Sequence, residues 1–178
     1  MIEKPRTKRK TAILVTTVFM TADTFLRDHV VALNELGYEV HLVVSPNTKC
    51  AAFQHDFDVT IHQIPMTRGI TLVRDLISLV RLLIFVLSKR QKLLNYHTLK
   101  AGLLGSLAGF FGLAPIRIFT IHGIVSLSRA GKIDILLRLL DRLTCALSTS
   151  GWCVSNRAQR DQYLELMREH GIVRDAAI

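Results

Sequence analysis

The chain has 178 residues, of which 49% are hydrophobic and 21% charged, enough for one domain with a buried core but short for two full α/β domains. A formal net charge of +9 indicates attraction to anions: nucleic acid, acidic lipid headgroups or phosphorylated small molecules. The three cysteines (Cys50, Cys145 and Cys153) are widely spaced and lack zinc-like partners. This argues against a disulfide framework and a metal site, and favours a reducing cytoplasm.

The first ten residues are rich in lysine and arginine, and we expect residues 1–10 to be a solvated basic tail before a domain at 11–178. The apolar run Ala12 to Met20 could mimic a secretory signal. Its Val and Thr content favours a strand, however, and no A-x-A cleavage pattern follows. Later apolar stretches contain charges or Gly and Pro, so no membrane-spanning helix is expected.

Strand-like apolar runs alternate with helical periodicity along the rest of the chain. The predicted strands are Ala12–Phe19, Glu39–Ser45, Val59–Ile64, Leu93–Tyr96, Ile116–Ile121 and Trp152–Val154. The predicted helices are Thr21–Leu36, Lys49–His55, Thr71–Ser88, Leu99–Phe111, Ile133–Leu147 and Asn156–His170, with Gly37 as a left-handed cap after the first of them. This alternation predicts an α/β fold: a doubly wound, mostly parallel Rossmann-like sheet with helices on both faces.

In such a sheet, ligands bind beyond the carboxyl ends of the strands, so polar residues at those ends are the first candidates. Asp23 follows the first strand, where a carboxylate suits a sugar hydroxyl, and Arg68 lies in the loop after the third. His97 and His122 close the fourth and fifth strands. The first turn, "TTVFMTADTF", has no glycine, which argues against a dinucleotide-binding fingerprint.

The segment after the fourth strand is the most informative. Thr98 is placed to cap a helix whose N-terminus attracts anions, and Lys100 in its first turn is a candidate for binding a phosphate; an exposed, merely solvated lysine is the alternative. Three glycines (Gly102, Gly105 and Gly109) weaken this helix in isolation. Close packing on the sheet explains them better than close approach of a ligand does.

The helix Thr71–Ser88 combines many aliphatic residues with basic ones. Arg74 and Arg81 lie within it, and Lys89, Arg90 and Lys92 follow. This pattern would suit contact with an anionic membrane if the apolar face were exposed, at the inner face of a cytoplasmic membrane, but burial against the sheet is favoured.

Four blocks in order resemble the N-terminal, acceptor-side domain of family 4 retaining glycosyltransferases, which have the GT-B fold. They are "FLRDHVVALNELGYEVHLVVSP", "YHTLKAGLLG", the strand ending in "IHG", and "GWCVSNRAQRDQYLE". The resemblance runs from about Thr11 to the end of the chain. Two features depart from the family: the glycine-rich first turn is missing, and Tyr96-His97-Thr98 replaces a His-Thr-His triplet.

The resemblance implies transfer of a sugar from a nucleotide-sugar to a lipid-linked or polysaccharide acceptor, with retention at the anomeric carbon. It implies no metal and no cofactor besides the nucleotide-sugar co-substrate. His122 would face the donor sugar, and His97, Lys100, Arg68 and Asp23 would contact acceptor or sugar, although a strand-end imidazole such as His97 is as often structural.

The resemblance also implies a second domain that holds the nucleotide-sugar, and none of its motifs is found in these residues. We therefore expect the chain to be inactive alone. The alternative is a non-catalytic subunit, or a membrane-recruiting partner, of a separate donor-binding polypeptide. Nucleic-acid binding is not expected, because aromatic residues are few and no recognised binding motif occurs.

Overall fold

The computed structural model describes residues 10–67, 69, 71–122 and 132–154. Within them lies a parallel six-stranded sheet with the strand order β3-β2-β1-β4-β5-β6. The strands are β1 (Lys10–Thr16), β2 (Tyr38–Val44), β3 (Thr60–Gln63), β4 (Leu93–His97), β5 (Ile116–Ile121) and β6 (Ser150–Val154). This is the strand order of a Rossmann fold, so the predicted fold class is confirmed.

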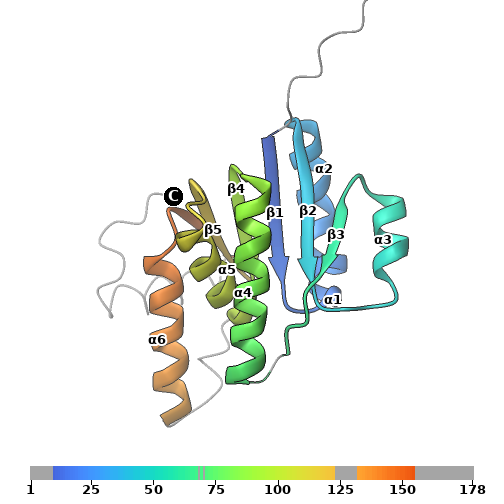
Figure 1. Cartoon of the computed structure of the whole chain (residues 1–178). Helices are drawn as coiled ribbons and strands as arrows, with labels where there is room; N and C mark the ends of the chain where they lie inside the picture. The colour runs from blue at the N-terminus through green and yellow to red at the C-terminus, as the bar shows by residue number, and fades with distance from the viewer. Residues whose placement is uncertain (1–9, 68, 70, 123–131, 155–178) are drawn as a thin grey trace, which may run out of the picture.

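Helices connect the strands and cover both faces of the sheet (Figure 1). The helices are α1 (Phe19–Thr21), the π-helical turn η1 (Ala22–Leu26), α2 (Arg27–Glu35), α3 (Cys50–Asp56), α4 (Leu72–Lys89), α5 (Leu99–Phe111) and α6 (Lys132–Ala146). In the described part of the chain, no helix is both long and apolar enough to cross a bilayer.

Two apolar clusters flank the sheet, because successive residues of each strand point to opposite faces. Ile13 and Val15 of β1 join α4, α5 and α6 in one cluster. Leu14, between them, joins η1, α2 and α3 in the other. The strands are therefore buried on both sides, which explains why their sequences are continuously apolar.

The first helical segment, which comprises α1, η1 and α2, differs from its prediction. β1 ends at Thr16, although the apolar run continues to Phe19, because Phe19 already opens α1 and packs edge-on against Phe53. An apolar run by itself does not distinguish the end of a strand from the start of a helix. Gly37 has φ +80°, which confirms the left-handed cap.

The glycines of α5 confirm the predicted close packing. A Cβ atom on Gly102 would lie 2.6 Å from the Phe119 ring, and one on Gly105 would lie 2.8 Å from Tyr96 Cβ. Gly109 has the same relation to Leu94. The helix therefore lies too close to β4 and β5 for side chains at these positions.

The predicted last helix, 156–170, lies outside the described residues, as does most of the basic tail.

Candidate functional site

The candidate site lies at the carboxyl edge of the sheet, between β1 and β4. These strands are neighbours, with Thr16 paired in register with His97, but the connections from β1 and from β4 cover opposite faces of the sheet. Such a switch point leaves a crevice that α/β proteins use for ligands. A hydrogen bond of 2.8 Å between the Thr17 and Thr98 hydroxyls joins the two strand ends.

Thr98 has a strained backbone, with φ +70° and ψ 155°. Residues other than glycine rarely adopt this conformation, and its cost is on the order of 1 to 3 kcal/mol. Thr98 does not cap α5 with its side chain, so that prediction is wrong: its hydroxyl bonds to Thr17 instead. The strained residue directly follows His97 and so helps to set where β4 ends and α5 begins.

His97 and His122 form a stacked, hydrogen-bonded pair at this edge. His97 Nδ1 lies 2.9 Å from His122 Nε2, and the ring planes are inclined by only 18°. His97 is fully buried, and its Nε2 has no hydrogen-bond partner among the described residues. His122, just beyond β5, is half-buried. The structure therefore brings together two residues that lie 25 positions apart in the sequence.

Two residues from the first helical segment complete the cluster. The Phe25 ring stacks on His122 with centroids 4.3 Å apart, and the His29 ring meets His97 edge-on at 5.9 Å. His29 Nδ1 lies 2.9 Å from the Phe25 carbonyl oxygen, so the imidazole donates this hydrogen bond. His29 was not predicted as a site residue. Its position one helical turn after Phe25 places both on one helix face, but the proximity to β4 is set by the tertiary fold.

Burial keeps the paired imidazoles neutral. It lowers the pKa of His97 well below its ordinary value, with further lowering from His122 and His29. Burial also lowers the pKa of His122, with a smaller effect from His29. The edge therefore presents neutral hydrogen-bonding rings, in which one N–H of the pair is committed to the other ring.

Lys100 lies apart from the histidines and is engaged by the neighbouring helix. Its Nζ lies 2.7 Å from Asp75 Oδ1 and also donates to the Gly69 carbonyl. The Lys100 side chain is only 12% exposed. The hydrogen bond from Lys100 lowers the pKa of Asp75 against the opposing effect of burial. In this arrangement the ammonium links the first turns of α5 and α4, and its role toward a phosphate stays a prediction.

The other two predicted residues are not part of the cluster. Asp23 lies in η1, is exposed, and forms an ion pair with Arg27 one turn later. Arg68 lies outside the described residues. No group of three or more potential metal ligands is found among the residues that the structure describes.

The amino-acid sequence is similar to part of a glycosyltransferase. The chain is 31% identical over 124 residues to the capsular polysaccharide biosynthesis glycosyltransferase CapM of Staphylococcus aureus. The alignment covers 70% of this chain and 32% of CapM, so the chain spans about a third of that relative's length. No protein-family model matches the chain.

Solved structures of UDP-N-acetylglucosamine 2-epimerases share the fold. One matches with a TM-score of 0.65 at 18% identity, over 89% of this chain and 45% of the epimerase. Those from Listeria monocytogenes and Methanocaldococcus jannaschii each match with a TM-score of 0.62, at 13% and 16% identity, over 90% and 93% of this chain and 43% and 44% of theirs. At these identities the likeness shows the Rossmann-like fold alone. The sequence similarity to CapM supports a function of the glycosyltransferase type.

Proposed function

We propose that this chain is the acceptor-side domain of a retaining, GT-B-type glycosyltransferase that transfers a sugar from a nucleotide-sugar to a lipid-linked or polysaccharide acceptor. The observation that carries the proposal is the His97–His122 pair at the switch point of a sheet whose sequence is similar to CapM. In such an enzyme, the carboxyl edge of this sheet would form half of the catalytic cleft.

His122 would hydrogen-bond a hydroxyl of the transferred sugar, with His97 as its positioning residue. The bond of 2.9 Å between them holds the orientation of the His122 ring and couples the tautomers of the two rings, because one of the two bonded nitrogens donates and the other accepts. Because both imidazoles are neutral, the ring would act on an uncharged sugar hydroxyl and not as a cation.

Departure of a nucleoside diphosphate requires fixed positive groups aimed at the developing charge. Lys100 at this edge is already neutralised by Asp75. We therefore assign that task to a donor-binding domain or polypeptide, and expect the 178-residue chain alone to be inactive.

Sugar transfer from radiolabelled UDP-sugars to lipid-linked saccharides of a membrane fraction tests the proposal, with the chain assayed alone and joined to a donor-binding domain. The joined protein should be active, and His122→Ala should lower its kcat by about 100-fold, the size of effect seen when one transition-state hydrogen bond is lost. His97→Ala should lower kcat less, and His97→Asn, which restores a donor near Nδ1, should recover part of the loss.

The matched control is His55→Ala, because His55 is 90% exposed and lies on α3 away from this edge. Its activity should equal that of the unchanged protein. Full activity of His122→Ala would contradict the assigned site. Sugar transfer by the 178-residue chain alone would contradict the assignment of diphosphate stabilisation to a separate donor-binding domain or polypeptide. Co-purification of the chain with a separate donor-binding polypeptide, with no catalytic loss in His122→Ala, would favour the non-catalytic subunit.

A further inference from the structure

Helix α4 is apolar on two opposite faces. Its inner face is buried against the sheet, with Leu82 and Val86 fully covered. Its outer face carries large apolar side chains that are 48% to 81% exposed: Leu72, Val73, Leu76, Ile77, Val80, Ile84 and Leu87. A surface helix usually buries its apolar stripe and exposes polar side chains, but no described residue covers this outer face.

Helix α6 also carries exposed apolar side chains. It lies on the same side of the sheet as α4, with α5 between them. Ile135, Leu136, Leu139 and Leu143 of α6 are 42% to 62% exposed. We call the exposed apolar residues of α4 and α6 the outer apolar face. A surface patch of this kind exceeds the scattered single residues that are usual on a monomer.

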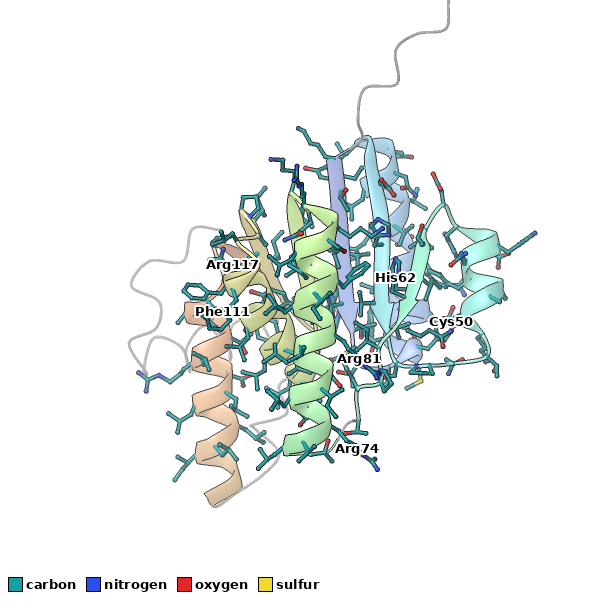
Figure 2. All side chains as sticks on the ribbon, viewed as in Figure 1. Cys50, His62, Arg74, Arg81, Phe111 and Arg117 are labelled. Carbon is teal, nitrogen blue, oxygen red and sulfur yellow. The ribbon has the colours of Figure 1, made fainter. Side chains whose placement is uncertain are left out.

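The charges around the outer apolar face are basic. Arg74 and Arg81 are exposed along one flank of α4, as Figure 2 shows, and Arg90 is exposed at its end. Among the described side chains of these two helices, the carboxylates are turned away: Asp75 is paired with Lys100, and Asp141 is on the inner side of α6. A partner surface would therefore meet apolar groups and positive charge together.

We propose that the outer apolar face docks on the surface of an anionic lipid bilayer. Apolar side chains enter the boundary between headgroups and acyl chains while flanking arginines pair with lipid phosphates, as in interfacial amphipathic helices. A second copy of the chain is a poorer occupant, because a two-fold interface would bring the same arginines of both copies together. The inference concerns lipid binding and does not depend on the proposed sugar transfer.

The docked orientation would place the start of α4, at the carboxyl edge of the sheet, near the headgroups. α4 begins at the carboxyl edge of the sheet, since it follows a parallel strand, and the Lys100–Asp75 pair ties its first turn to that of α5. Leu72, Val73 and Leu76, 61% to 81% exposed, lie at this end of α4. The His97–His122 pair, which packs against Phe25 and His29, would lie on the other face of the sheet, beyond the same edge.

Co-sedimentation of the full chain with vesicles tests the proposal, using phosphatidylcholine alone and phosphatidylcholine mixed with phosphatidylglycerol. We expect binding to the anionic vesicles that weakens in high salt. The double variant Ile77→Ser/Ile84→Ser should lose at least about tenfold in affinity, and Arg81→Gln about fivefold. Both changes are at exposed positions, and urea unfolding verifies that each variant folds.

Matched controls make the same changes elsewhere. Val31→Ser/Leu36→Ser removes exposed apolar groups in α2 and at its C-terminal end, on the opposite face of the sheet, and Lys49→Gln removes a charge next to α3. A third control, Arg6→Gln/Lys8→Gln/Arg9→Gln, removes three of the five basic side chains among the first ten residues. Equal losses in the α4 variants and these controls, or loss in the N-terminal variant alone, would overturn the proposal. The proposal would also be overturned if the unsubstituted chain does not bind vesicles and instead forms a dimer that Ile77→Ser/Ile84→Ser dissociates.

Discussion

At the scale of single residues, ionisable groups show how far burial changes a side chain's chemistry. His97 and His122 were identified at strand ends, and the fold turns them into one neutral, hydrogen-bonded pair. The helical periodicity of the sequence did not indicate that Asp141 is an unusual carboxylate. It lies on the inner side of α6 between Leu137 and Cys145, which are both buried, and burial raises the pKa of its carboxyl to about 7.

Replacing this carboxyl should stabilise the protein in alkaline conditions. Because the folded pKa of Asp141 lies above its unfolded value of 3.8, its burial costs nothing below pH 3.8 and costs progressively more as pH rises through about 7. We expect Asp141→Asn to raise the free energy of unfolding by about 1 to 2 kcal/mol above about pH 8. Urea unfolding at alkaline and at acid pH measures this. An equal gain at both pH values would show that charge is not the cause.

At the scale of elements, close packing against β4 and β5 holds α5 in place, and its glycines allow the short distance between the helix and these strands. The first turn of α5 is further tied to α4 by the Lys100–Asp75 ion pair, whose side chains are 12% and 19% exposed. A glycine-rich helix of low intrinsic stability therefore gains its order from close contact with Tyr96 and Phe119 and from its neighbouring helix.

A methyl group at Gly105 should disrupt that contact. The new Cβ would lie 2.8 Å from Tyr96 Cβ, an atom of a fully buried side chain that cannot swing aside. Overpacking outweighs the higher helix propensity of alanine, so we expect Gly105→Ala to lower the free energy of unfolding by about 1 to 2 kcal/mol. Thermal or urea unfolding measures this loss. Gly69→Ala, where a Cβ meets nothing within 4 Å, is the control and should change stability by less than about 0.5 kcal/mol.

At the scale of the whole molecule, a histidine pair with one buried and one half-buried ring lies on each face of the sheet. His41 and His62, 3.1 Å apart, lie against Phe85 of α4, whereas His97 and His122 lie against the first helical segment. Burial, aided by charges on His41 and Lys89, lowers the pKa of His62 to about 4. Both layers of helices therefore cover imidazoles that resist protonation.

Acid should consequently loosen both layers. Each of these histidines has a folded pKa below the unfolded value of 6.5, so its contribution to stability is full above pH 6.5 and is lost as pH falls toward the folded pKa, about 4 for His62. We expect His62→Gln to flatten the decline in unfolding free energy between pH 6.5 and about 4, relative to the unchanged chain. Parallel pH profiles for the two proteins would contradict this assignment.

The sequence by itself determined the alternation of strands and helices, the parallel sheet and the strand-end positions of His97 and His122, because periodicity and chain order encode these features locally. It also predicted the packing of the α5 glycines. The tertiary structure alone decided which residues meet: His29 and Phe25 against the histidine pair, Lys100 with Asp75, and Thr98 with Thr17 in place of a helix cap. It also decided that α4 is buried on one face and exposed on the other. Both outcomes depend on contacts between segments distant in the chain, which no local pattern specifies.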